Sequence, residues 1–216
     1  MVYTLIRALA QFTLRVLCRL QVAGGEHVPE RGALVLAANH VSNVDPVVVA
    51  CAIRRKLHFM AKAELFRNPA FGWFLRQLQA FPVSRGQVSP STLRRSLALL
   101  QEGHALVVFP EGTRGDGANL QRAIGGAGML AVRSGCPVVP MYHEGTAEVL
   151  PRGGRFPRPA AVRVWIGPPI VFRREVAERP EPYEAVSQQI MEAIAGLRAR
   201  AKPPRVAGAR SESPSP

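Results

Sequence analysis

The residues best suited to acid–base chemistry in this chain are His40 and Asp45, which lie close together in the sequence. They follow an apolar run at 33–38 that predicts a buried strand, so His40 stands between this strand and a helix predicted at 47–54. In open α/β sheets, ligands bind beyond the carboxyl ends of the strands. A histidine at such an edge can take and return a proton near neutral pH, which makes His40 a candidate general base.

A contact between these two side chains requires a bend in the chain. Neighbours on one helix face lie three or four residues apart, so a continuous helix would separate His40 from Asp45. We expect Ser42 to provide the bend as a helix N-cap, with Asp45 in the first turn and Pro46 tolerated beside it. Asp45 could then orient the second ring nitrogen of His40, as the acid of a catalytic triad does. In the alternative, Asp45 only caps the helix and His40 is a structural residue.

Charged residues also follow two other predicted strands. Arg85 comes directly after a strand predicted at 80–84. The loop from Glu111 to Arg114 follows a strand predicted at 105–109. Guanidinium groups pair with phosphate oxygens and stay charged, so this arrangement indicates a base acting on a substrate held by its phosphate. No Walker loop, GxGxxG motif or zinc-ligand spacing occurs, and we interpret the isolated histidines as structural: His58, His104 and His143.

Apolar periodicity predicts alternating strands and helices along most of the chain. This alternation is typical of an α/β fold, here a mixed, mostly parallel sheet flanked by helices, with an N-terminal amphipathic helix. Further strands are predicted at 57–61, 136–142 and 161–166, and further helices at 70–79, 89–102, 120–135 and 183–200. Pro137 and Pro140 indicate that their strand lies at an edge or has a shortened ladder. Glycines weaken the start of the helix at 120–135.

Composition indicates one well-packed domain that binds a negatively charged partner. The 216 residues are 47% hydrophobic and carry a net charge of +13, with a pI near 11.2. This charge predicts binding to anionic lipid, a phosphorylated substrate, an acidic carrier protein or nucleic acid. Nucleic acid is disfavoured because aromatic residues make up only 6% of the chain and concentrate in one helix. The odd number of cysteines, all in apolar sequence, indicates buried reduced thiols of a cytoplasmic protein.

The stretch at 3–22 predicts a helix with one narrow polar stripe on a mostly apolar surface. The polar residues recur every four positions: Arg7, Gln11, Arg15 and Arg19. Arginines within the span argue against a transmembrane helix and against a signal peptide. We expect this helix to lie in a membrane interface with its arginines among anionic headgroups. A helix packed on the core of the domain would show the same pattern.

Four short blocks of sequence stand out when they are considered together. They are Asn39-His40 with Asp45 five residues on, Phe81-Pro82-Val83-Ser84-Arg85-Gly86, Phe109-Pro110-Glu111-Gly112-Thr113-Arg114 and Cys136-Pro137-Val138-Val139-Pro140. Their order and rough spacing are those of the glycerolipid acyltransferases. The first and third blocks together are specific, whereas either alone is weak. Over roughly residues 20–172, the chain resembles the bacterial 1-acyl-sn-glycerol-3-phosphate acyltransferases of this family.

The resemblance implies a reaction and a role for each block. His40 would deprotonate the acceptor hydroxyl, which attacks an acyl thioester without a covalent acyl-enzyme, and Asp45 would orient His40. The donor would be acyl-coenzyme A or acyl carrier protein, the acceptor the sn-2 hydroxyl of lysophosphatidic acid, and the product phosphatidic acid. No cofactor and no metal are expected. The substrate phosphate would be held by Arg85, Glu111, Gly112, Thr113 and Arg114, and the acyl side shaped by Pro137, Val138, Val139 and Pro140.

The resemblance also implies a location in the cell. Since its substrate is a lipid, we expect a peripheral protein on the cytoplasmic face of the cell membrane. Residues 1–22 would be the interface helix, 23–200 a single acyltransferase domain and 201–216 a disordered tail.

Two departures from the family pattern keep other acceptors open. Gly115 stands where a serine is common, and Gly125 stands where a lysine is common. The acceptor could therefore be another lysolipid, such as a lyso-ornithine lipid. The alternative from a different class is a basic membrane-binding module without catalysis.

Overall fold

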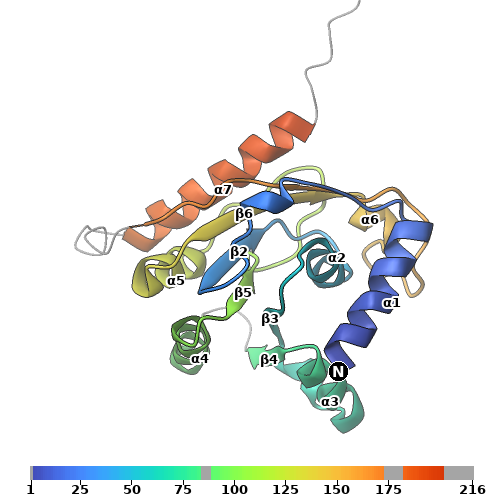
Figure 1. Ribbon diagram of the computed structural model, residues 1–216, viewed down its shortest axis with the longest axis horizontal. Coiled ribbons are helices and arrows are strands. Elements are labelled where there is room, and N and C mark those ends of the chain that lie inside the picture. Colours follow the sequence, from blue (N-terminus) through green and yellow to red (C-terminus); the bar gives the residue numbers. More distant parts are fainter. Residues whose placement is uncertain (1, 84–88, 173–181, 202–216) are drawn as a thin grey trace, which may run out of the picture.

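The described residues form a seven-stranded sheet with helices on both faces (Figure 1). The computed structural model describes residues 2–83, 89–172 and 182–201. Arg85 and all but the first residue of the predicted tail at 201–216 lie outside these ranges. The predicted α/β class and the mixed, mostly parallel sheet are confirmed.

The strands of the sheet follow the order β1-β7-β6-β2-β5-β3-β4. Neighbours run parallel except β6 and β7, which run antiparallel. The strands are β1 (Gln21–Ala23), β2 (Leu34–Ala38), β3 (Leu57–Lys62), β4 (Ala80–Val83), β5 (Ala105–Val108), β6 (Val138–Glu144) and β7 (Arg163–Ile166). Because β2 lies between its parallel neighbours β5 and β6, the residues that follow these three strands meet at one edge of the sheet.

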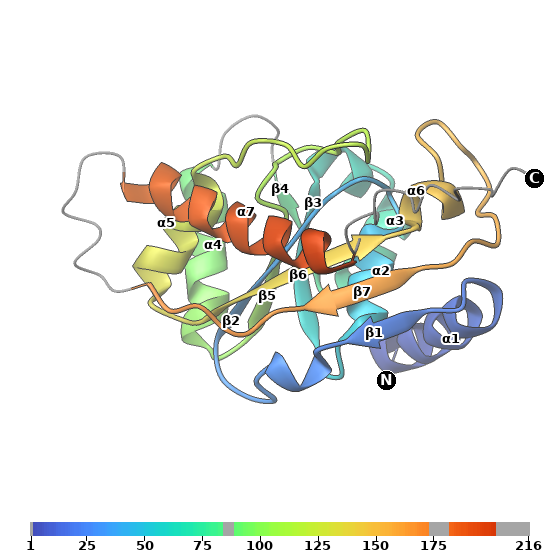
Figure 2. The ribbon, with the colours of Figure 1, turned by 90° about the horizontal axis from the view of Figure 1, so that it is seen from above.

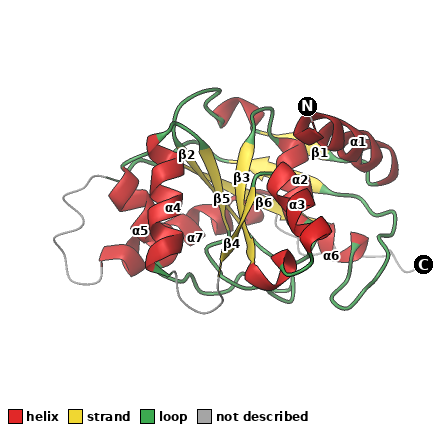
Figure 3. Ribbon diagram, turned by 90° about the horizontal axis from the view of Figure 1, so that it is seen from below, coloured by secondary structure: helices red, strands yellow, loops and turns green. Residues whose placement is uncertain are grey.

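Helices cover the two faces of the sheet in separate sets. α1, α2 and α3 lie on one side, and α4, α5 and α7 lie on the other (Figure 1 and Figure 3). The helices are α1 (Val2–Leu17), α2 (Asp45–Ala52), α3 (Pro69–Gln77), α4 (Pro90–Gln101), α5 (Gly126–Ser134), α6 (Thr146–Val149) and α7 (Pro182–Ala201), with short 3-10 helices at Gly25–His27 and Ala63–Phe66. Asn68 and Ser89 are the N-caps of α3 and α4, and their side chains accept backbone N–H groups.

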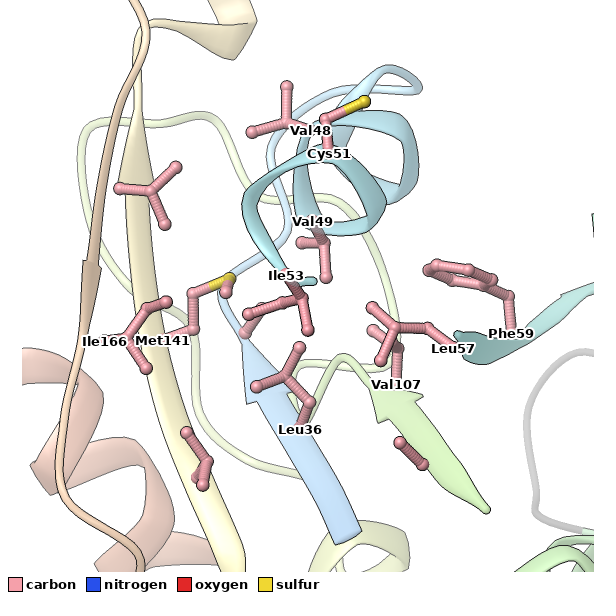
Figure 4. Close-up of a cluster of buried hydrophobic side chains, with 14 of the residues drawn as sticks. Leu36, Val48, Val49, Cys51, Ile53, Leu57, Phe59, Val107, Met141 and Ile166 are labelled. Atoms are coloured by element: carbon pink, nitrogen blue, oxygen red, sulfur yellow. The ribbon is translucent and has the colours of Figure 1, made fainter. Parts of the chain in front are cut away.

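Strand β2 contributes to two separate cores because successive side chains point to opposite faces of a sheet. Leu34, Leu36 and Ala38 pack in the cluster beneath α1 and α2. Val35 and Ala37 pack in the cluster beneath α5 and α7. Side chains from α2, β2, β3, β5 and β6 converge in the first cluster (Figure 4). The central strand is thereby buried on both faces, which holds its carboxyl end in place.

The N-terminal helix ends at Leu17 rather than at residue 22 as predicted. Residues Gln21–Ala23 instead form the edge strand β1, beside β7 (Figure 2). The helix stops because the backbone groups that follow it form hydrogen bonds with the segment before β7 instead of within a helix. The Cys18 carbonyl accepts the Val162 N–H at 2.9 Å, and the Gln21 N–H donates to the Val162 carbonyl at 3.0 Å. In the part of the chain that the structure describes, helices with the length and apolar character needed to cross a membrane are absent.

Helix α1 turns part of its polar stripe toward the protein and an apolar face outward. Arg7 Nη1 donates to the Arg54 carbonyl at 2.7 Å, just beyond the end of α2. Gln11 Nε2 donates to the Cys51 carbonyl of α2 at 3.1 Å. The expectation that the arginines lie among lipid headgroups does not hold for Arg7, which binds the protein itself. The large outward side chains are 53–73% exposed: Leu5, Leu9, Phe12, Val16 and Leu17.

Strand β6 is internal, so the prediction that its prolines place it at an edge is wrong. The predicted shortening of its ladder is present, because pairing with β7 begins only at Met141. Pro140 is tolerated because β7 has already ended at Ile166 beside it. The Pro140 carbonyl accepts the Gly167 N–H at 2.9 Å, which is the contact that closes this end of the ladder.

Helix α5 begins at Gly126 rather than at residue 120 as predicted. The residues before it use their N–H groups outside any helix. The Gln121 N–H donates to Glu111 Oε2 at 3.0 Å, and the Ile124 N–H donates to the Pro110 carbonyl at 2.8 Å. These bonds hold the segment against the loop after β5. The N–H groups are therefore not available for the helical hydrogen bonds that the sequence pattern predicts.

Gly128 lets α5 and α7 approach closely. Its N–H is near the start of α5, where helical partners are lacking, and it donates to Ser187 Oγ of α7 at 2.8 Å. A Cβ at this position would collide with the Tyr183 carbonyl. The glycine that weakens the helix in isolation is thus required by the packing of the two helices.

We predict that Gly128→Ala destabilises the protein by about 2 kcal/mol, because the extra methyl group has no room between the two helices. Gly196→Ala is the matched control in α7, since no atom lies within 4 Å of the position that its Cβ would take. Alanine there should stabilise the protein by about 0.5–1 kcal/mol through helix propensity. Urea unfolding of both variants measures the difference, and equal changes would show that the α5–α7 contact adjusts freely.

Candidate active site

Asn39 fixes the chain where β2 ends. Its side-chain amide pairs with the backbone of His143 on the neighbouring strand β6. Asn39 Nδ2 donates to the His143 carbonyl at 3.0 Å, and the His143 N–H donates to Asn39 Oδ1 at 2.8 Å. This pairing continues the contact between the strands beyond the last backbone pair, Ala38 and Met141. His40, the next residue, is therefore held at the carboxyl edge of the sheet.

The predicted contact between His40 and Asp45 is present in the structure. His40 Nδ1 lies 2.7 Å from Asp45 Oδ2. The same oxygen accepts the N–H groups of Val41 and Ser42, each at 2.7 Å. Asp45 is the first residue of α2, so its carboxylate folds back over the loop that leads into its own helix. These three hydrogen bonds to Asp45 Oδ2 produce the bend that a contact between His40 and Asp45 requires.

Ser42 does not cap α2 with its side chain, contrary to the prediction. The N-cap position is occupied by Val44, and Ser42 Oγ donates to the Leu150 carbonyl at 2.8 Å. Ser42 Oγ also accepts the Val44 N–H at 3.4 Å, and the Asp45 carboxylate accepts the Ser42 N–H, so only the carboxylate half of a capping box is present. Ser42 therefore connects the His40 loop to the chain at the end of α6.

The Asp45 carboxylate is buried and ionised. Burial alone would raise its pKa, but the hydrogen bond from His40, nearby His143 and the Ser42 N–H together hold the pKa below its usual range. An ionised carboxylate only accepts hydrogen bonds, so we assign the His40 proton to Nδ1 and a free lone pair to Nε2. The His40 side chain is 19% exposed, which leaves Nε2 accessible to a substrate.

Two residues after β5 support His40 from the other side. The Phe109 ring stacks on the imidazole, with centroids 4.2 Å apart and planes inclined by 19°. Glu111 is buried, and its Oε1 accepts the His40 N–H at 2.8 Å while its Oε2 accepts the Gln121 N–H. Burial raises the pKa of Glu111, and these two bonds oppose the shift. Glu111 thus holds the loop from within, whereas the resemblance implies a contact with the substrate phosphate.

The loop after Glu111 turns back toward His40. Gly112 has a φ of 65°, in the left-handed region that favours glycine, and a Cβ there would also collide with the Ile124 side chain. The Gly115 N–H donates to the His40 carbonyl at 2.8 Å. Both the N–H and the carbonyl of His40 are therefore bound by the segment that follows β5.

A cavity of about 510 Å³ opens beside His40. Its polar lining includes Asn43, Thr113 and the cationic side chains of Lys62, Arg114 and Arg152. The remainder lies between the sheet and helices α4 and α5, and its apolar side chains are Met60, Val83, Val107, Val108, Phe109, Pro110, Ile124, Ala127 and Leu130. The cavity can therefore hold a molecule with an anionic end and an apolar end.

The structure brings some of the predicted binding residues to this cavity and not others. Gly112, Thr113 and Arg114 line it together with His40. The segment 137–140, implied to shape the acyl side, is not part of the described lining, and Val138 and Val139 are fully buried in β6. Arg85 lies outside the described residues.

Lys62 and Arg152 line the cavity although no motif singles them out. Lys62 is the last residue of β3, so the strand-end rule that selected Arg85 applies to it as well. Arg152 lies in the loop after α6, and no local pattern predicts that this loop reaches the edge at which His40 lies. Within residues 2–83, 89–172 and 182–201, no group of three or more His, Cys, Asp and Glu side chains could hold a metal.

Comparison with known families decides the class of protein. The family model described as "Acyltransferase" matches residues 19–144, more than half of the chain. The chain belongs to the acyltransferase family. The acyltransferase is 31% identical over 181 residues to the 1-acyl-sn-glycerol-3-phosphate acyltransferase of Bacillus subtilis, covering 80% of this chain and 87% of that one. It is 29% identical over 195 residues to the enzyme of the same name from Pseudomonas aeruginosa, covering 86% and 74%.

A solved structure has the same fold as this acyltransferase. The crystal structure of the 1-acyl-sn-glycerophosphate (LPA) acyltransferase PlsC from Thermotoga maritima superposes with a TM-score of 0.76, at 24% identity. The match covers 94% of this chain and 81% of that chain. The family match includes His40, Asp45 and the loop with Arg114, and it ends at Glu144, the last residue of β6. Arg152 lies beyond that boundary.

Proposed function

We propose that this acyltransferase moves a fatty acyl group from an acyl thioester to the sn-2 hydroxyl of lysophosphatidic acid, giving phosphatidic acid for phospholipid synthesis. The observation that carries the proposal is the His40–Asp45 pair beside a cavity that has both cationic and apolar lining. The names of the relatives from Bacillus subtilis and Pseudomonas aeruginosa support the same acceptor.

In the proposed reaction, His40 acts as a general base. Its Nε2 takes the proton of the acceptor hydroxyl as the hydroxyl oxygen attacks the thioester carbonyl carbon. The tetrahedral intermediate collapses, the C–S bond breaks, and the imidazolium returns the proton to the leaving thiolate. Asp45 orients the ring and stabilises its positive charge. We propose direct transfer from acyl-coenzyme A or acyl carrier protein, with no covalent acyl-enzyme, no cofactor and no metal.

The cationic lining suits the phosphate of the acceptor. Arg114, Lys62 and Arg152 come from three separate segments that face one cavity. Arg85, outside the described residues, is a further proposed ligand because β4, which ends two residues before it in the sequence, has its carboxyl end at the same edge of the sheet. A lysine is common in the family at the position where this chain has Gly125. In this chain, Lys62 and Arg152 would supply that positive charge. Charge-assisted bonds from several segments would place the acceptor hydroxyl near His40.

The apolar lining suits an acyl chain. It is formed by side chains of β3, β4, β5 and α5 together with Phe109 and Ile124, and it adjoins the polar end of the cavity. Each methylene group that leaves water for such a surface contributes about 0.8 kcal/mol to binding. We therefore assign the acyl chain to this lining rather than to the segment 137–140, which belongs to the interior of the domain.

We further propose that the enzyme binds the cytoplasmic face of the cell membrane through α1. Leu5, Leu9 and Phe12 lie on one face of the helix, and each is at least 67% exposed. Inserting this face into the interface would bury apolar surface, and the net charge of +13 would add attraction to anionic lipid. Arg7 and Gln11 hold α1 on α2, so the apolar face stays presented.

Replacing His40 with alanine should lower turnover with lysophosphatidic acid by about 10²-fold or more, because proton transfer in the transition state is lost. Asp45→Asn should cause a smaller but still large loss. Acyl transfer is measured with acyl-coenzyme A and with acyl carrier protein as donor, and thermal melting confirms the fold.

His104→Ala is the control for this experiment, because its ring is partly exposed and does not line the described cavity. It should retain activity. A folded His40→Ala protein with near-normal turnover would exclude His40 as the base. Absence of transfer by the unmodified chain with both donors would favour a non-catalytic membrane-binding module.

Replacing Arg114 or Arg152 with alanine should raise the KM for lysophosphatidic acid by about 10-fold, and much less for a monoacylglycerol, which has no phosphate. Arg155→Ala is the control, since Arg155 lies in the same loop as Arg152 and is likewise exposed, but is outside the described lining. Steady-state kinetics on both acceptors provides the comparison. Equal losses would mean that these arginines organise the loop, and faster acylation of a lyso-ornithine lipid would assign a different acceptor.

Replacing Leu5, Leu9 and Phe12 together with glutamine should weaken sedimentation with anionic liposomes by about 10-fold or more, because apolar area no longer enters the interface. Turnover on a vesicle-borne acceptor should fall, while turnover on a short-chain monomeric acceptor should persist. Substitution is preferred to deletion because Leu14, on the same helix, is buried in the core.

Val171→Gln is the control for an exposed apolar residue elsewhere on the surface. Val171 is 64% exposed and follows Ile170, which pairs with the first residue of β6, at the end of that strand remote from His143. It should leave liposome binding unchanged. If the triple variant also binds liposomes as tightly as the unmodified protein, the membrane contact lies on another surface.

A further inference from the structure

His143, in β6, is a buried histidine that has no role in the reaction described so far. Its side chain and that of Asp45 are both fully buried, and its Nδ1 lies 3.9 Å from Asp45 Oδ1. His40 uses the other oxygen, Oδ2. The two histidines therefore approach one carboxylate from its two different oxygens.

Asp45 Oδ1 and several polar atoms near it have no hydrogen-bond partner among the described residues. They are Asp45 Oδ1, both ring nitrogens of His143 and the Thr146 hydroxyl oxygen. Thr146, at the start of α6, is close enough to Asp45 to help lower its pKa. A buried carboxylate oxygen requires donors, and the candidates are His143 Nδ1, 3.9 Å from Oδ1, and the hydroxyl of Thr146. A small movement of the ring, or one bridging water molecule, closes the gap.

The protonation state of His143 determines what it offers to Asp45. Burial lowers the pKa of His143, and the opposing effect of Asp45 is smaller, so the ring is neutral near pH 7. A neutral imidazole has one N–H group. On Nδ1 that group points a donor at the carboxylate, whereas on Nε2 it would leave a lone pair facing a negative charge. The carboxylate therefore favours the Nδ1–H form.

We propose that His143 is a positioning residue that donates its Nδ1–H to Asp45 Oδ1 and holds the carboxylate between two imidazole rings. This role rests on the proposed function of His40 as the base. A donor on Oδ1 draws negative charge away from Oδ2, so Asp45 holds the proton of the His40 imidazolium less tightly. Activity should therefore persist to lower pH than it would without this donor. His143 also keeps the carboxylate from rotating away from His40.

The other groups that act on this set come from several elements. His40, after β2, and Asp45, in α2, are the titratable groups that interact with His143 among the described residues. Glu111, after β5, interacts electrostatically with both of them. Asn39 binds only the backbone of His143. Removing the His143 ring while keeping these groups therefore isolates its effect on the His40–Asp45 pair.

The tautomer of His143 in the unmodified protein gives a direct test. NMR of protein labelled with a nitrogen isotope in its histidines, assigned with a His143→Asn variant, distinguishes a proton on Nδ1 from one on Nε2. We expect the Nδ1–H form at neutral pH, with no charged form. A proton on Nε2, or an imidazolium ring at pH 7, would overturn the proposal.

The pH profile of kcat/KM gives a second test. His143→Leu keeps the bulk of the side chain but removes the donor, and should move the midpoint of the acidic limb up by about 0.5–1 pH unit. His143→Asn keeps an N–H group near the position of Nδ1, and its midpoint should stay within about 0.2 unit of the unmodified enzyme. His104→Leu is the control and should cause no shift.

The outcomes separate this role from simple packing and from the proposed function. Equal shifts in His143→Leu and His143→Asn, or no shift in a folded His143→Leu protein, would show that His143 only fills space. If His143→Leu does not fold, the tautomer of the unmodified protein decides. An active His40→Ala protein would overturn the assignment of His40 as the base. If His40→Ala is inactive but His143 of the unmodified enzyme carries its proton on Nε2, only the role of His143 is overturned.

Discussion

Oδ2 of Asp45 accepts three hydrogen bonds, from the His40 ring and from the N–H groups of Val41 and Ser42, and the rest of the site depends on them. A buried anion is costly unless donors surround it, so the loop cannot open without leaving that charge uncompensated. The end of β2, the start of α2 and the imidazole therefore behave as one unit. Asn39 joins this unit to β6, and Glu111 joins it to the loop after β5.

The parts of the site that could be predicted from sequence are those set by local geometry. His40 and Asp45 meet because a strand end and a helix start lie within a few residues of each other, and this closeness is visible in the order of residue types. Arg114 reaches the same edge because parallel strands carry their following loops to one side of a sheet. The two cores, one on each face of the sheet, likewise follow from the unbroken apolar sequence of β2, whose successive side chains point to opposite faces.

The remaining features depend on contacts between distant segments. Ser42 is a good N-cap by type, but its hydroxyl donates to the Leu150 carbonyl, more than a hundred residues away in the sequence, instead of capping α2. Pro140 is acceptable in an internal strand only because the neighbouring strand ends beside it. Arg152 enters the cavity through a loop whose path no local pattern determines. Each case required knowledge of which other segment lies next to the residue.

Helix α2 connects two surfaces with different tasks. Its first residue carries the carboxylate that orients His40, and its last turn accepts the Gln11 side chain of α1, with the Arg7 side chain bound just beyond it. At about 1.5 Å per residue, this short helix is a stiff spacer about 12 Å long. Any surface that α1 rests upon therefore lies at a set height from the reacting atoms. The distance that an acceptor must move from that surface to reach His40 is thus determined by the length of one helix.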